Sequence, residues 1–353
     1  MTLPALGPGE ALPPDVAPSP HQVADALLVE VLGAPDPLVA AEERASELTS
    51  LLLRDQWMTL LDGIGPTLPA WIAWRAAYGL HHLGHLRDAA AVADRAETGG
   101  DPADLARLAA TRASIAWNRG DRDGAQTFVT TAGALDIAAG GAAQGVVDVA
   151  RALLAAAEGD RDGNLRYYER ARSWAERSDD DLTLERVLNN LSSRALESGD
   201  PEAAVEFAVA GQQVNLRTGH QSGLALLRHN LAEALMTLGR LDEALAEAHQ
   251  ARTFYALAGS PNAGSTWQLV AEIQSTLGLA TQAAASFRHA IGAAELEGDA
   301  QTLVPALAGL ALVTAPSDPA GATELVARVE REPIAVRGAG ALTAASWVHL
   351  CTG

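Results

Sequence analysis

The sequence predicts an all-α fold, built as a solenoid of tandem antiparallel helix hairpins. A glycine recurs at steps of 36 to 40 residues through most of the chain, and a small residue follows most of these glycines five positions later. The 48% hydrophobic content comes mainly from Ala and Leu, with four Phe and four Tyr. This composition favours closely packed helices over sheets. A fixed period of this length is typical of one supersecondary unit repeated in tandem.

The recurring glycines are expected to end the first helix of each unit, because glycine readily adopts the left-handed conformation that stops a helix. They are Gly84, Gly120, Gly159, Gly199, Gly239 and Gly278, with Ser317 in the next slot. The small residues that follow would let the second helix pack closely against the first. They are Ala89, Ala125, Ala204, Ala244, Ala283 and Ala322, and Asn164 is the exception.

One unit carries a recognisable set of residues: Trp267, Val270, Ala271, Gly278, Ala283, Phe287 and Ala290. This spacing resembles the tetratricopeptide repeat pattern, and the resemblance covers roughly residues 71–327. The period is about forty residues rather than the usual ~34. The longer form is similar to repeats in sensor and scaffold regions of bacterial signalling regulators. The resemblance implies a right-handed superhelix whose first helices line a concave wall. Arg112 and Arg151 depart from the pattern, since they stand in leucine slots.

The chain before the repeats predicts a leader and a cap. Six prolines within residues 1–20 indicate a disordered segment. Residues 21–68 are expected to form N-terminal capping helices and a linker. One helix begins at His21, and a second runs from the Asp36-Pro37 cap to about Asp55. Because Gly63, Gly65 and Pro66 interrupt it, the stretch 57–68 is interpreted as a linker with one turn of helix. A separate small domain is the alternative for the first two helices.

About seven hairpins are expected between residues 69 and 330. The ranges are 69–97, 101–134, 142–177, 181–218, 221–258, 261–296 and 302–329, the last weakened by three prolines. Residues 331–353 are predicted to close the array with one helix carrying Trp347, because an exposed stacking face is costly.

Charge and cysteine content narrow the function classes. The net charge is −19, and all 25 basic residues are arginines. A net-negative surface repels phosphates, so we expect no direct nucleic-acid binding. The absence of lysine, with much Ala, Gly, Arg and Pro, is typical of a GC-rich bacterial genome. One cysteine, Cys351, excludes an internal disulfide. We expect a cytoplasmic protein without membrane contact, since signal-peptide and membrane-span patterns are absent.

The sequence carries no recognisable catalytic signature, so the chain is predicted not to be an enzyme, with no cofactor and no bound metal. Phosphate-binding loops, serine nucleophile elbows and zinc-protease helices are absent. His81, His85 and Asp88 are the alternative, a metal-dependent enzyme on a helical scaffold, because histidines four apart share a helix face. Gly84 lies between them, so solvent-facing or structural histidines are the favoured interpretation. The acidic run at residues 178–181 is interpreted as a helix cap.

Polar residues on the expected first helices form the candidate partner-binding site. They are Arg186, Asn189, Asn190, Ser193, His229, Asn230, Glu233, Gln268 and Glu272. A ladder of carboxamides can both donate to and accept from an extended peptide backbone, and Arg186 can take a carboxylate. Inter-helix hydrogen bonding is the alternative for the asparagines. Trp71, Trp74 and Trp117 are candidates for an aromatic anchor, with core packing as their commoner role.

The sequence therefore predicts a non-catalytic scaffold that binds a peptide or protein partner in its concave groove. A role in bacterial signalling or transcription regulation is the narrower form of this prediction. A small-ligand sensor module of a regulator is the alternative. Self-association through uncapped ends, giving a homo-oligomer, stays open.

Overall fold

The computed structural model describes residues 18–332, and in this part of the chain all regular structure is helical, α1 to α18, apart from one isolated bridge between Leu68 and Ala96. The predicted all-α fold of repeated hairpins is confirmed. Most of the expected leader, and the expected closing helix with Trp347 and Cys351, lie outside the described residues. No helix between residues 18 and 332 combines the length and the apolar character needed to cross a bilayer.

Four helices precede the repeats, and two sequence expectations fail here. They are α1 (Pro20–Leu32), α2 (Pro37–Glu43), α3 (Ala45–Leu51) and α4 (Arg54–Ile64). The single helix expected over 36–55 breaks at Arg44, whose φ of −103° and ψ of 16° leave the helical region. The expected linker at 57–68 is wrong, because its glycines and proline end a helix of 11 residues rather than interrupt it. Trp57 on α4 is fully buried.

Seven helix pairs follow, and the helices of each pair pack against each other. The first four pairs are α5 (Ala70–His82) with α6 (Leu86–Asp94), α7 (Pro102–Asn118) with α8 (Arg122–Ala138), α9 (Gln144–Ala157) with α10 (Arg161–Arg177), and α11 (Asp181–Glu197) with α12 (Pro201–Thr218). The last three pairs are α13 (Gln221–Thr237) with α14 (Leu241–Leu257), α15 (Ala263–Thr276) with α16 (Ala280–Glu297), and α17 (Ala300–Thr314) with α18 (Pro319–Arg331).

The turn inside each of the first six pairs has the geometry that its glycine predicts. The six turn glycines have φ between 75° and 85°, a region that side-chain-bearing residues avoid. Ser317 does not have this conformation, so the seventh pair turns differently. Its amide donates to the carbonyl of Thr314 at 3.0 Å, and α18 begins only at Pro319.

The three departures from the repeat pattern are each accommodated by polar bonds. Asn164 is buried in the alanine slot, where its Nδ2 donates to the carbonyl of Ala152 at 2.8 Å. Arg151 pairs with the fully buried Asp148 at 2.9 Å. Arg112 extends to the end of α6 and pairs with Asp94 at 3.1 Å. A carboxamide or guanidinium thus replaces an apolar contact and finds polar partners, although Arg112 Nε stays buried without a hydrogen-bond partner among residues 18–332.

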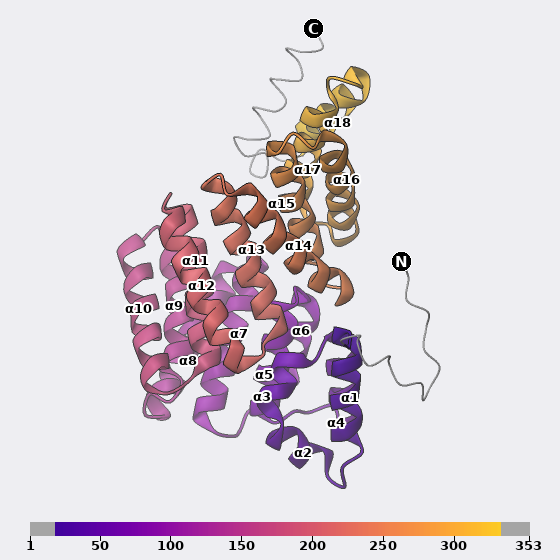
Figure 1. Cartoon of the computed structure of the whole chain (residues 1–353). Coiled ribbons are helices and arrows are strands. Elements are labelled where there is room, and N and C mark those ends of the chain that lie inside the picture. The colour runs from indigo at the N-terminus through magenta and orange to yellow at the C-terminus, as the bar shows by residue number, and fades with distance from the viewer. Residues whose placement is uncertain (1–17, 333–353) are drawn as a thin grey trace.

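The array curls until its start meets its fifth and sixth hairpins (Figure 1), where α13 contacts α3 and α5, and α14 contacts α1. The hydroxyl of Ser260 donates to the carbonyl of Leu83 at 2.7 Å, and that of Ser50 donates to the carbonyl of Thr218 at 2.9 Å. Ala258 belongs to the same apolar cluster as Trp57 and the N-terminal helices. Residues 20 to about 276 therefore form a closed turn, and α16 to α18 lead away from it.

Candidate functional site

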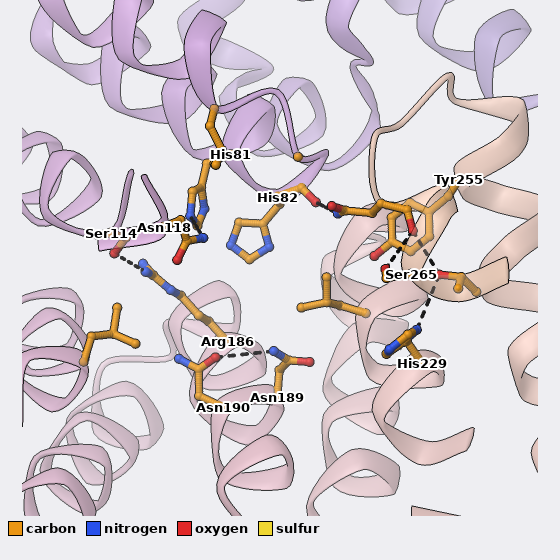
Figure 2. A pocket seen from close by; sticks show the side chains of 16 residues that line it. His81, His82, Ser114, Asn118, Arg186, Asn189, Asn190, His229, Tyr255 and Ser265 are labelled. Carbon is orange, nitrogen blue, oxygen red and sulfur yellow. Dashed lines mark hydrogen bonds between the residues drawn. The ribbon is translucent and has the colours of Figure 1, made fainter. Parts of the chain in front are cut away.

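A polar cavity of about 350 Å³ lies inside the closed turn. The first helices of the hairpins supply most of its wall, as Figure 2 shows: α5 contributes His81 and His82, α11 contributes Arg186 and two asparagines, and α13 contributes His229. The connection from α14 to α15 completes the wall with Asn262. Because α5 and this connection meet only through closure of the turn, the concave interior is a cavity walled on both sides and partly open to solvent.

Arg186 is the charged residue of this wall. Its side chain is 7% exposed, its Nη2 donates to Ser114 Oγ at 2.7 Å, and its guanidinium lies 5.6 Å from the centroid of the Tyr78 ring. Burial lowers the pKa of Arg186, although a guanidinium keeps its proton in proteins. The cavity lining contains no Asp or Glu. The protein therefore places a buried positive charge at the cavity without a carboxylate to neutralise it.

The three asparagines bond to one another in a chain, and two of them, Asn189 and Asn190, line the cavity. Asn230 Nδ2 donates to the backbone carbonyl of Asn189 at 3.2 Å and to its Oδ1 at 3.1 Å. Asn189 Nδ2 donates to Asn190 Oδ1 at 3.4 Å. Asn190 lines the cavity and Asn230 does not. The amide chain therefore joins α13 to α11 and leaves the Asn190 side chain as the cavity-facing end.

Burial keeps the cavity histidines neutral. It lowers the pKa of His81 to about 3, with help from the Arg186 charge, and that of His229 to about 4. The pKa of His82 is also well below its usual range, because of burial and the neighbouring His220, His81 and Arg186 side chains. His82 Nε2 is buried and has no hydrogen-bond partner among residues 18–332. Neutral imidazoles offer the cavity both donors and acceptors.

The structure brings four of the nine predicted partner-binding residues together: Arg186, Asn189, Asn190 and His229. The lining does not include the other five: Ser193, Asn230, Glu233, Gln268 and Glu272. Gln268 donates to Glu272 at 2.9 Å. Burial raises the pKa of Glu233, which the negative charges of Glu272 and Glu197 raise further. These residues mark an acidic stretch beyond the cavity. The binding role of all nine stays a prediction.

The residues of the proposed metal alternative and of the acidic run at 178–181 make other contacts in the structure. Asp88 pairs with Arg54 at 2.5 Å, and Asn118 Nδ2 lies 3.0 Å from His81 Nε2. In the part of the chain that the structure describes, no group of three or more His, Cys, Asp or Glu side chains is placed to hold a metal. Asp180 caps α11 by accepting from the amide of Thr183 at 3.0 Å.

Sequence inspection missed a buried polar network beside the cavity. His220 Nδ1 lies 2.9 Å from Glu185 Oε1, and its Nε2 lies 2.9 Å from Ser222 Oγ. Asn215 and Thr218 also donate to Glu185, at 3.0 and 2.6 Å. Serine, histidine and acid are ordered here as in hydrolases, yet Ser222 is 5% exposed and lies outside the cavity lining. Glu185 and His220 are 35 residues apart, so no short sequence motif predicts the network.

The fold and its interior define the class of protein: a helical-hairpin repeat protein closed around a polar cavity. Within that class the fold is tetratricopeptide-like, as its solved structural neighbours show. No protein-family model matches the sequence, and no curated protein matches it. The assignment therefore rests on the fold.

Three solved structures illustrate the likeness. A Rap protein complexed with competence and sporulation factor has a TM-score of 0.58 and 13% identity, over 94% of this chain and 91% of that one. The Cut9–Hcn1 hetero-tetramer of APC/C has a TM-score of 0.62 and 15% sequence identity, and the match covers 92% of this chain and 58% of that one. A STAND protein with a tetratricopeptide repeat sensor, from Pyrococcus horikoshii, has a TM-score of 0.54 and 12% sequence identity. That match covers 94% of this chain and 51% of the other. This chain thus spans little more than half of the latter two. Identities this low indicate a shared fold.

Proposed function

We propose that this protein is a regulatory binding protein that captures the acidic end of a peptide or protein segment in the closed interior cavity. The observation that carries the proposal is Arg186, a buried guanidinium facing a cavity whose lining contains no carboxylate. Burying a charge without a partner is costly. A ligand carboxylate would offset that cost through a charge-assisted, two-pronged hydrogen bond.

The remaining wall suits the backbone of such a ligand. Asn190 and Asn118 present amides that both donate and accept, and His82 Nε2 has no protein partner among the described residues. The cavity of about 350 Å³ holds a short stretch of chain rather than a long extended peptide. Binding rather than catalysis is the function that these groups support.

The structural neighbours favour the same direction. One is a Rap protein solved with a signalling factor, and another carries a repeat sensor. We therefore propose a role in bacterial signalling or transcription regulation, exercised in the cytoplasm through protein contacts and without direct nucleic-acid binding. A small-ligand sensor is the second candidate, favoured by the small size of the cavity, since an anionic metabolite would meet Arg186 as well as a peptide terminus does.

Peptide libraries test the proposal. A pool of random short peptides with free carboxyl termini should bind the wild-type protein, and the same pool with amidated termini should bind about tenfold more weakly or worse. Arg186→Met should remove that preference, while Arg177→Met, on an exposed residue, should keep it. Equal binding of both pools to the wild type would reject the role of Arg186. Tight binding of small carboxylic acids alone would favour the sensor candidate.

A further inference from the structure

A second, larger cavity of about 870 Å³ lies at the other end of the closed interior. The first cavity takes residues from the ends of α5 and α7 and from the middle of α11 and α13. This one is lined mainly by the N-terminal turns of the first helices, including Trp71 and Trp74 of α5, Arg107 of α7 and Leu182 of α11. A small void of about 30 Å³ lies between the two, against Tyr78 and Arg186. The interior therefore contains two chambers separated by a neck too narrow for a ligand.

The second chamber is aromatic. Trp71, Trp74 and Trp174 line it, and two of the three rings are fixed through their N–H groups. Trp74 Nε1 donates to Asp104 Oδ1 at 3.1 Å, and Trp174 Nε1 donates to the carbonyl of Gly141 at 3.2 Å. Indole faces attract cations, and the guanidiniums of Arg75 and Arg107 already lie over the Trp74 ring, 4.5 and 5.8 Å from its centroid. No arginine of residues 18–332 lies over Trp71 or Trp174 in this way, and a rigid ring loses little entropy when a ligand binds.

The charges around these rings leave a negative excess. The lining holds five carboxylates and three guanidiniums. Arg107 pairs with Asp104 at 3.0 Å, and Arg217 pairs with Asp181 at 2.7 Å. Arg75 donates to Thr49 at 3.2 Å. The chamber's own cations are thus already engaged.

Three of the carboxylates, those of Glu42, Asp179 and Asp180, make no ion pair within 4 Å among the described residues. Asp180 caps α11, whereas Glu42 and Asp179 are exposed at the chamber. Asp179 also has a φ of 52°, the positive value that glycine takes at the corresponding turns, Gly219, Gly259 and Gly298. An aspartate there costs roughly 1 kcal/mol relative to glycine. The chain thus keeps an acidic side chain at this turn although a glycine would be more stable.

We propose that this second chamber is a binding site for an organic cation, a guanidinium or alkylammonium group carried on an apolar stem. The rings of Trp71 and Trp174 take the stem and the cation, and Glu42 and Asp179 supply the opposite charge. The group comes either from an arginine or lysine side chain of a peptide or from a free amine. This site is independent of the one at Arg186, which recognises the opposite charge.

Calorimetric titration tests the site with n-propylguanidinium, with acetyl-Gly-Arg-Gly-amide and with n-propylurea, a neutral molecule of similar shape. The wild type should bind a guanidinium probe and ignore the urea. Comparable affinities for the two cationic probes would indicate that the natural ligand is a free amine. A much higher affinity for the peptide would indicate that it is a protein segment. If neither cationic probe binds, or if n-propylurea binds as tightly as they do, the proposal is wrong.

Matched variants locate the site. The double variant Glu42→Gln with Asp179→Asn should weaken probe binding about tenfold. The double variant Glu43→Gln with Asp162→Asn changes the net charge equally on exposed residues outside the lining, and should leave binding unchanged. Equal weakening in both pairs would show a general charge effect and reject the site. Arg186→Met should leave cation binding intact, so this site and the proposed peptide site can fail separately.

Discussion

Asn262 Nδ2 donates to the carbonyl of His82 at 3.2 Å, across 180 residues of sequence. This bond lies at the seam where α5 meets the connection between α14 and α15, and both residues line the interior cavity. The seam thus determines whether the cavity exists at all, because an open superhelix would separate the two walls.

Gly84 provides a direct test of the seam. Its φ is 85°, and an added Cβ would lie 2.6 Å from Asn262 Oδ1. Gly159 has a similar φ of 75° in the same turn of another hairpin, with nothing within 4 Å of such a Cβ. Both substitutions to alanine should cost ~1 kcal/mol from backbone strain.

The Gly84→Ala variant should lose roughly 1–2 kcal/mol more, because Asn262 must move and its bond to His82 is lost. Urea denaturation gives the difference between the variants, and amide exchange at residues 258–262 should rise only in Gly84→Ala. Identical unfolding free energies for the two variants would mean that the seam contributes nothing to stability.

Glu185 should be the most sensitive buried acid of the closed turn. It is 2% exposed and accepts hydrogen bonds from Asn215 and Thr218, besides its contact with His220. Glu185→Ala should lower the unfolding free energy by ~3 kcal/mol, since it leaves several buried polar groups unpaired. Glu206→Ala, on the exposed face of α12, should change it by less than ~0.5 kcal/mol. A small effect at Glu185 would show that the network relaxes or admits water.

Arg186 should contribute to binding while costing stability. Its buried charge has no carboxylate partner in the cavity wall, so Arg186→Met should keep or raise the unfolding free energy, by up to ~1 kcal/mol. Arg177→Met, at an exposed site, should leave it unchanged. Thermal denaturation of both variants checks this. Marked destabilisation by Arg186→Met would identify the residue as structural and weaken its assignment to a ligand.

Stability should fall in mild acid because of the cavity histidines. Burial depresses the pKa of His81 to about 3 and that of His229 to about 4, below the usual 6.5. The unfolded chain therefore binds more protons than the folded one as pH falls below 6.5, and stability declines until the folded-state pKa values are reached. Each histidine contributes at most ~1.4 kcal/mol per pH unit in that window.

Replacing His229 with asparagine isolates the contribution of His229 to this pH dependence of stability. The slope of unfolding free energy against pH, measured between pH 4.5 and 6.5 by urea denaturation, should become shallower than in the wild type. His21→Asn, in the first turn of the N-terminal helix α1, serves as the control. If His229→Asn keeps the wild-type slope, the His229 side chain is solvated rather than buried.

The sequence predicts the repeated hairpins well because their causes are local. A turn glycine and a small packing residue act within one hairpin, so their spacing alone locates most helix ends. The error at α4 has a local cause too, since Gly63, Gly65 and Pro66 punctuate its end and resemble an interruption. Closure of the turn is different in kind. It depends on contacts such as Ser260 with Leu83, 177 residues apart, which no short-range pattern contains.

The same distinction explains the candidate site. Register within each repeat predicts that Arg186 and Asn190 lie on the inner wall, and both line the cavity. The same reasoning does not separate Asn190, which lines the cavity, from Asn230, which bonds to Asn189 on the neighbouring first helix. That outcome depends on how closely α13 approaches α11. The sequence indicates Trp71 and Trp74 as candidates for an aromatic anchor, and both line the second chamber. It does not indicate Trp174, which lies about a hundred residues further along the chain and reaches the same cavity only through the packing of the hairpins.

The central claim is that the closed interior binds a ligand through Arg186. Native mass spectrometry of the protein purified from its own host tests it most directly. The wild type and Arg177→Met should carry a stoichiometric added mass that fragments to a peptide or a small carboxylic acid, and Arg186→Met should carry none. An added mass retained in full by Arg186→Met, or absent from the wild type, would contradict the claim.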